Sequence, residues 1–87
     1  MLSQQFQVFL RVAECGSFTK AAKQLLVTPA SVMKHTNTLE DRLGAVLFTR
    51  DKKGVTLTAA GRSLYKDGKK MAALAKNAAV RVKQAEQ

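Results

Sequence analysis

The sequence contains few of the residues on which most disulfide, metal and enzyme sites depend. Its 87 residues include one cysteine, one histidine, one proline and no tryptophan. A single cysteine, Cys15, excludes an internal disulfide and argues against an oxidising compartment. One histidine and six scattered carboxylates provide neither a metal-ligand cluster nor a nucleophile paired with a base. We therefore expect no catalytic, metal or cofactor site and no enzymatic activity in these residues.

Long apolar segments are missing as well. No apolar run approaches the ~20 residues that a membrane-spanning helix needs. The first residues also lack the basic and apolar regions of a signal peptide. These absences predict a cytoplasmic protein that does not enter a membrane.

Acidic residues are outnumbered by basic ones. Fifteen lysines and arginines against six acidic residues give a formal net charge of +9. Such an excess favours a polyanionic partner, with nucleic acid first and an anionic membrane surface second. The last helical segment is basic, but its apolar face consists largely of alanine and glycine, which bury poorly in a membrane interface. The charge therefore favours nucleic acid.

Residues 18–37 have the pattern of two helices joined by a short turn. Phe18, Ala22 and Leu25 share one helix face, and the pattern then breaks. A new helical pattern begins after Thr28, which is suited to an N-cap position. A helix, a turn of about three residues and a second helix form a helix-turn-helix, whose second helix enters the DNA major groove in DNA-binding examples.

The second helix of this motif should run from Pro29 to Leu43, with Gly44 as its stop. Val32, Leu39 and Leu43 share the face that we expect to be buried. Short or polar side chains leave its early turns on other faces, where they can reach base edges and phosphates. These side chains are Ala30, Ser31, Lys34 and His35.

The first turn of the motif's first helix is a second candidate contact with DNA. Ser17 should cap this helix, and its free N–H groups, with Thr19 and Lys20, could hold a phosphate. A preceding helix over Leu2–Glu14 should support the core, with Ser3 as its N-cap.

Residues 47–57 predict a small β-hairpin with a basic turn, which beside a helix-turn-helix is called a wing. Arg50, Lys52 and Lys53 would lie over the DNA backbone or minor groove, where cations meet the strongest negative potential. The alternative is a solvated turn whose charges serve solubility.

The last segment, from Thr58 to about Glu86, predicts one long helix with a heptad-like seam. The seam favours antiparallel or parallel pairing with a second copy, whereas the alternative is a single amphipathic helix that frays. We assign dimerisation to Leu64, Gly68, Met71, Ala75, Ala78 and Val82. The predicted domains are a winged helix-turn-helix over 1–58 and a linker or dimerisation helix over 59–87.

These motifs, taken in order, resemble the N-terminal DNA-binding domain of LysR-type transcriptional regulators. The resemblance is strong over residues 1 to about 62. It rests on Phe9 to Ala22, Leu25, Val27, Thr28 to Val32, Leu39-Glu40, Leu43-Gly44, Leu47 to Arg50, and Leu57 to Gly61.

The resemblance implies a mainly α winged helix-turn-helix that controls transcription as a homodimer, with a tetramer left open for a full-length protein. It implies that Thr28, Pro29, Ser31, Lys34 and the wing around Arg50 to Lys53 contact double-stranded DNA. Family members also carry an effector-binding domain, so we expect a fragment of a longer regulator and a small-molecule effector for the missing domain. A winged helix of the molybdate-responsive regulator type is the alternative.

Four residues depart from the family's pattern. Leu26 fills a turn position often taken by Gly, Asn or His, and Met33 stands where Ser is common. Thr36 replaces an aliphatic residue, so its hydroxyl should bond a backbone carbonyl one turn back. Asn37 replaces a frequent arginine. These departures leave the base preferences open and increase the expected contribution of the wing.

Overall fold

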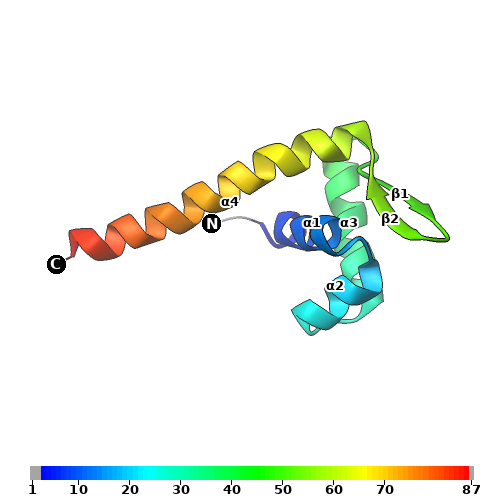
Figure 1. The fold of residues 1–87 in the computed structure, drawn as a ribbon, viewed down its shortest axis with the longest axis horizontal. Coiled ribbons are helices and arrows are strands. Elements are labelled where there is room, and N and C mark those ends of the chain that lie inside the picture. The colour runs from blue at the N-terminus through cyan, green and yellow to red at the C-terminus, as the bar shows by residue number, and fades with distance from the viewer. Residues whose placement is uncertain (1–2, 87) are drawn as a thin grey trace.

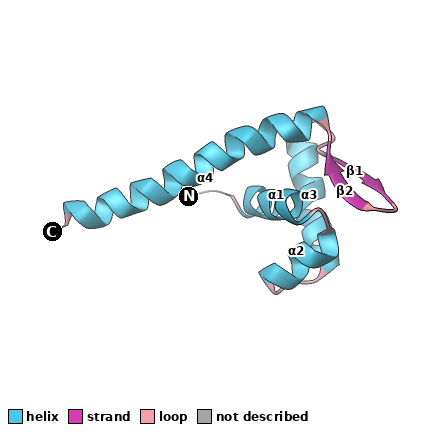
Figure 2. Cartoon of the chain, viewed as in Figure 1, coloured by secondary structure: helices cyan, strands magenta, loops and turns pink. Residues whose placement is uncertain are grey.

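The computed structural model describes residues 3–86, which form four helices and one two-stranded hairpin (Figures 1 and 2). The elements are α1 (Gln4–Cys15), α2 (Phe18–Leu25), α3 (Pro29–Leu43), β1 (Phe48–Asp51), β2 (Gly54–Leu57) and α4 (Ala59–Ala85). The predicted mainly α winged helix-turn-helix is confirmed. Leu2, which the sequence placed in the first helix, lies outside the described residues, as does Gln87 at the end of the predicted linker segment.

Each helix begins at a hydroxyl side chain that accepts a hydrogen bond from a backbone N–H three residues on. The caps are Ser3, Ser17, Thr28 and Thr58, which accept from the N–H groups of Phe6, Lys20, Ser31 and Gly61. Such caps stabilise a helix by about 1 kcal/mol each. Because each cap fixes the first turn, α2 and α3 begin where the sequence predicted, at Phe18 and Pro29, and α4 begins at Ala59, directly after Thr58.

The core lies where α1, α2 and α3 meet. Phe9, Val12 and Val32 are fully buried there, and the small Ala21 and Ala22 let α2 approach α3 closely. Thr36 is also buried, and its hydroxyl donates to the carbonyl of Met33 at 2.9 Å, as predicted. Leu43 departs from expectation because it is 52% exposed, so the buried face of α3 ends before this residue.

The turn between α2 and α3 contains an unusual backbone conformation. Leu26 has a φ of 59° and is 91% exposed. A non-glycine residue in this left-handed region costs about 1–2 kcal/mol. The sequence had identified this position as a departure from the family's small or polar residues, and nothing in the structure explains why leucine stands there.

The hairpin is docked on the turn that joins α1 to α2. Its strands pair antiparallel, with Phe48 opposite Leu57. The N–H of Val55 donates to the carbonyl of Gly16 at 3.0 Å. Gly54 has a φ of 133°, and a Cβ on it would lie 2.7 Å from the Gly16 carbonyl oxygen, so this contact requires glycine. The wing is therefore held against the helix-turn-helix.

The start of α4 is fixed to the segment before β1. Thr58 donates its hydroxyl to the carbonyl of Val46 at 2.6 Å and its N–H to the carbonyl of Leu47 at 3.0 Å. Gly61 is buried, and a Cβ there would clash with the same Leu47 carbonyl. The N–H of Leu47 in turn donates to a carboxylate oxygen of Glu40 on α3 at 2.7 Å. These bonds set the direction in which α4 leaves the core.

The first half of α4 packs against α1, and its second half extends away from the other helices (Figure 1). Gly68 is buried against Phe6 and Leu10 of α1, where a side chain would have no room. Farther along, Leu74 and Val82 are 62% and 63% exposed. The helix gives the chain an extent of 51 × 27 × 21 Å. No helix within residues 3–86 is both long and apolar enough to cross a membrane.

Candidate nucleic-acid interface

The first half of α3 presents three of the six predicted recognition residues to solvent. Pro29, Ala30 and Lys34 are exposed, whereas Val32 and Thr36 face the core. The spacing of 3.6 residues per turn produces this division, because each residue advances about 100° around the helix. Lys34 can therefore extend its ammonium group away from the protein.

Three other predicted recognition residues are more constrained. Thr28 is exposed, but its side-chain oxygen already accepts the N–H of Ser31 at 3.1 Å as the helix cap. Ser31 and His35 are half-buried and line a small hollow beside α1 and the α2–α3 turn. Thr28 retains its hydroxyl proton as a donor, whereas Ser31 and His35 reach less far outward than Lys34.

The N-terminus of α2 contributes a second group of predicted contact residues. Ser17 is half-buried and caps the helix by accepting from the N–H of Lys20 at 3.2 Å. Thr19 and Lys20 are exposed. A capped helix start carries partial positive charge and free N–H groups, which favour an anion at this end.

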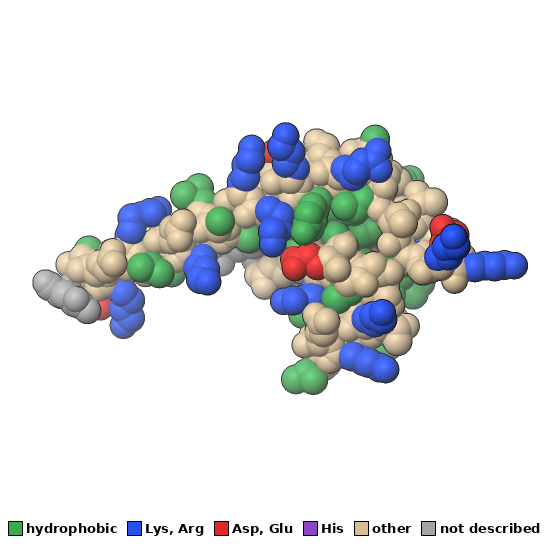
Figure 3. Space-filling view, viewed as in Figure 1, with side chains coloured by type: hydrophobic (Ala, Val, Ile, Leu, Met, Phe, Trp, Pro, Cys, Tyr) green, Lys and Arg blue, Asp and Glu red, His purple; other side chains and the backbone are tan. Residues whose placement is uncertain are grey.

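The wing carries the third group. Arg50, Lys52 and Lys53 are all exposed, and Asp51 shapes the turn by accepting from the N–H of Lys53 at 2.8 Å. Figure 3 shows basic side chains on the wing, over α2 and along α4. In residues 3–86 neither Lys34 nor the three wing cations form an ion pair with a carboxylate. Their charges are available to a partner.

One contact at this surface was not predicted from the sequence. The guanidinium carbon of Arg50 lies 4.7 Å from the centre of the Phe18 ring. The sequence pattern places Phe18 only on the apolar face of α2. No periodicity signals the contact, because it joins two elements whose relative placement depends on the docked wing.

The predicted dimerisation residues fall into two groups. Leu64, Gly68 and Met71 lie beside the core of their own chain, and Gly68 is covered by it. Ala75, Ala78 and Val82 lie on the extended part of α4. The two groups share a helix face but have different surroundings: only the first is next to the other helices.

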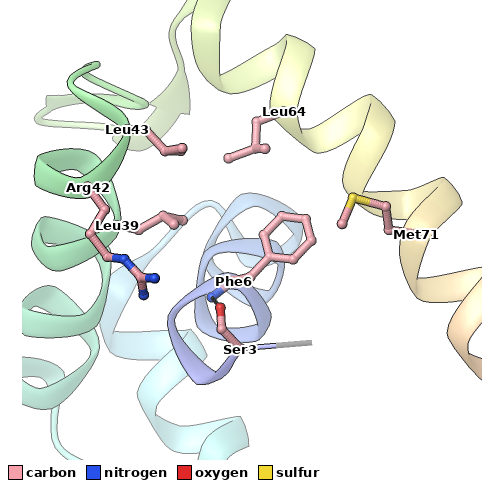
Figure 4. A pocket seen from close by; sticks show the side chains of 7 residues that line it. All are labelled: Ser3, Phe6, Leu39, Arg42, Leu43, Leu64 and Met71. Carbon is pink, nitrogen blue, oxygen red and sulfur yellow. Dashed lines mark hydrogen bonds between the residues drawn. The ribbon is translucent and has the colours of Figure 1, made fainter. Parts of the chain in front are cut away.

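An apolar groove opens beside the first group, between α1, α3 and α4 (Figure 4). The ring of Phe6 points toward Leu64 and Met71, with Leu43 at the far wall. The groove is lined by Ser3, Phe6, Leu39, Arg42, Leu43, Leu64 and Met71. The exposure of Leu43 is explained by its place on this groove.

The part of the chain that the structure describes contains no candidate metal site. No group of three His, Cys, Asp or Glu side chains there lies close enough to hold a metal ion. Cys15 is half-buried beside Gly16 and forms no disulfide.

The fold and these surfaces define a winged helix-turn-helix. The family model described as "Bacterial regulatory helix-turn-helix protein, lysR family" matches residues 3–62. The chain belongs to this family, as the motifs in its sequence predicted. The match favours the LysR-type interpretation over the molybdate-responsive alternative.

Two curated relatives of this chain are named as regulators of transcription. HTH-type transcriptional regulator TcbR from a Pseudomonas species is 38% identical over 72 residues, which cover 83% of this chain and 24% of TcbR. HTH-type transcriptional activator AllS from Salmonella typhimurium is 41% identical over 66 residues, covering 76% of this chain and 21% of AllS. The chain thus spans about a quarter of the length of these relatives. Their names describe regulators of transcription, in agreement with the expectation that this chain is not an enzyme.

Solved structures match along nearly the whole chain. The crystal structure of the CbnR_DBD-DNA complex superposes with a TM-score of 0.91 at 34% identity, covering 100% of both chains. The BenM_DBD/catB site 1 DNA complex gives a TM-score of 0.91 at 27% identity, covering 97% of this chain and 93% of that one. CbnR, a LysR family transcriptional regulator, gives 0.88 at 35% identity, covering 95% of this chain and 29% of CbnR.

Proposed function

We propose that this chain binds double-stranded DNA at specific sequences and controls transcription as part of a dimeric regulator. The observation that carries the proposal is the exposed first half of α3, with Lys34 unpaired and a docked cationic wing on the same domain. The DNA complexes named for CbnR and BenM, which share this fold at TM-scores of 0.91, support it.

The recognition step would place the start of α3 in the major groove. Lys34 would donate to guanine O6 and N7, the acceptors that lysine and arginine read most often. Thr28 and Ser31 would add hydrogen bonds, His35 would contact a base or a phosphate, and Ala30 is small enough to let the helix approach base edges. Pro29 shapes the first turn of α3 and, in this proposal, also contacts DNA.

Phosphate contacts would orient the domain on the duplex. The start of α2, with Ser17, Thr19 and Lys20, faces the backbone in this arrangement, and Arg50, Lys52 and Lys53 lie over the backbone or minor groove. Because these contacts release counterions from DNA, affinity should fall steeply as salt rises. Binding to DNA in this way would place the protein in the cytoplasm.

We infer that two copies pair through α4 in antiparallel orientation. The six assigned seam positions are spaced symmetrically about Ala73. Antiparallel pairing sets Leu64 of one copy opposite Val82 of the other, and Met71 opposite Ala75. The exposed Val82 then enters the apolar groove of the second copy, whereas parallel pairing would set the two grooves opposite each other and leave Val82 opposite Val82. This complementarity supports the antiparallel arrangement.

In this pair Gly68 would bring α4 close to its own α1, because Phe6 and Leu10 fill the space on its Cβ side. Ala78 of the second copy would then pack beside Gly68, on the uncovered side of α4. A twofold dimer would present two α3 helices to half-sites about one helical turn apart or a multiple of it. The effector expected from the resemblance would bind outside residues 1–87, and a tetramer of a longer protein likewise stays a prediction.

Two lysine substitutions test the division between base and phosphate contacts. Lys34→Ala should weaken binding to a duplex selected from a random library by about tenfold or more, because a base contact contributes about 1–3 kcal/mol of discrimination. The same variant should change binding to a scrambled duplex much less. Fluorescence anisotropy measures the dissociation constant for each of the two duplexes.

Lys53→Ala is the matched control, because it removes the same charge from the wing. It should weaken binding to both duplexes by a similar factor. It should also reduce the slope of log affinity against log salt concentration by about one, because one fewer counterion is released. If Lys34→Ala weakened binding to the selected and scrambled duplexes equally, α3 would not read bases through Lys34.

A further inference from the structure

The Phe18 ring is fixed in place by the core. Phe18 is the first residue of α2 and is half-buried. Its ring meets the Phe48 ring edge-on, with centroids 5.9 Å apart and planes at 73°. Phe48 in turn packs on the buried Phe9 at 5.3 Å. The ring therefore has little freedom, and it presents a face to the guanidinium of Arg50.

Arg50 is fixed from the other side by the wing. It lies on β1 opposite Val55 of β2. Val55 donates its N–H to the carbonyl of Gly16, two residues before Phe18. The strand that carries Arg50 and the helix start that carries Phe18 are therefore held in a defined relative position.

The stack leaves the guanidinium ready to bind an anion. Arg50 is exposed, and no carboxylate within residues 3–86 pairs with it. A guanidinium over an aromatic ring keeps free the N–H donors that point away from the ring, and these donors match phosphate geometry. An arginine already held in one position also loses less side-chain freedom on binding.

We propose that Phe18 is a positioning residue for DNA binding: its ring holds Arg50 at the junction of the wing and α2, aimed at one phosphate of the duplex. This inference rests on the proposed DNA-binding function. It assigns to Phe18 a role in affinity that is separate from its role in the core. The contact also links the wing to the helix-turn-helix at the binding surface itself.

The test is a double-mutant cycle with Phe18→Leu and Arg50→Ala, measured by anisotropy on a labelled mixed-sequence duplex over a range of salt concentrations. Phe18→Leu keeps an apolar side chain but removes the ring face. It should weaken binding about two- to fivefold, the range of an exposed cation–π contact, while the salt dependence stays unchanged. In the Arg50→Ala background, the same change should have almost no effect.

Phe18→Tyr is the conservative control, because it retains the ring and should retain wild-type affinity. Arg50→Ala should reduce the slope of log affinity against log salt concentration by about one, since it removes a phosphate contact. If Phe18→Leu weakened binding by the same factor with and without Arg50, the ring would act only through the core, and the proposal would be overturned.

A measurement without DNA separates this proposal from the proposed function. In NMR spectra of the free wild-type protein, the side-chain protons near the Arg50 guanidinium should be shifted upfield by the ring, and Phe18→Leu should abolish the shift. Absence of the shift in the wild type would overturn the stack. A shift accompanied by no binding of the wild type to any duplex would overturn the DNA-binding function, and with it the positioning role.

Discussion

Replacing Val32 with aspartate should unfold the domain. Val32 is 0% exposed on the face of α3 that packs against the core. An unpaired carboxylate at this position would cost several kcal/mol. A domain of this size is stabilised by only about 4–13 kcal/mol. We expect Val32→Asp to show no cooperative thermal transition by circular dichroism, or a transition lowered by tens of degrees.

Asn37→Asp is the control for this prediction. It adds the same charge to the same helix, but Asn37 is exposed. Its thermal transition should stay within a few degrees of the wild type, because exposed substitutions change stability by about 0.5 kcal/mol or less. A native-like transition for Val32→Asp would show that α3 does not face the core with this side.

Replacing Val82 with glutamate should dissociate the proposed dimer. Val82 is 63% exposed in the isolated chain and would enter the apolar groove of the second copy in the antiparallel pair. Each dimer has two such contacts, and each buried valine contributes about 1.5 kcal/mol or more. The dimer should therefore weaken by at least about 100-fold. Sedimentation velocity at micromolar concentration would show a monomer for the variant and a dimer for the wild type.

Val80→Glu is the matched control, since Val80 is 47% exposed on the same helix but points away from the seam. It adds the same carboxylate two residues away and should leave the dimer intact. Equal dissociation by both variants would indicate a general charge effect, and a wild type that sediments only as a monomer would contradict pairing through α4.

Local signals in the sequence predicted the elements of the fold well. Ser3, Ser17 and Thr28 accept hydrogen bonds from the first turns that they were predicted to cap, and Gly16 and Gly44 end α1 and α3 in the left-handed region. These signals work because a cap satisfies N–H groups that the helix itself leaves free. They involve residues close in sequence, so they do not depend on the packing of distant elements.

The sequence could not show whether each apolar helix face is covered by the same chain, covered by a second copy or exposed to solvent. A repeat of alternating four- and three-residue steps identifies a face of α4, but the structure divides this face between its own core and an exposed extension. Gly68 is buried by Phe6 and Leu10 of the same chain, whereas Val82 is exposed. Leu43 was placed in the core for the same reason and proves to line the groove. Periodicity shows which residues share a face of a helix, but only the packed structure shows whether that face is covered by the same chain or exposed.

The contact between Phe18 and Arg50 was missed for a related reason. Its two residues lie on different elements, and their approach depends on Gly54 and on the bond from Val55 to Gly16. Each residue alone had an adequate explanation in the sequence, one as core and the other as a wing cation. Only the docking of the wing brings them together.

Selection of bound duplexes from a random DNA library tests the central claim most directly. We expect enrichment of one half-site that recurs with twofold symmetry, with centres separated by about one helical turn or a multiple of it. Lys34→Ala should lose preference at defined positions of that half-site, whereas Lys53→Ala should recover the same sequence. Recovery of duplexes no different from the starting library, by a wild-type chain that is folded and dimeric, would contradict sequence-specific recognition by this domain.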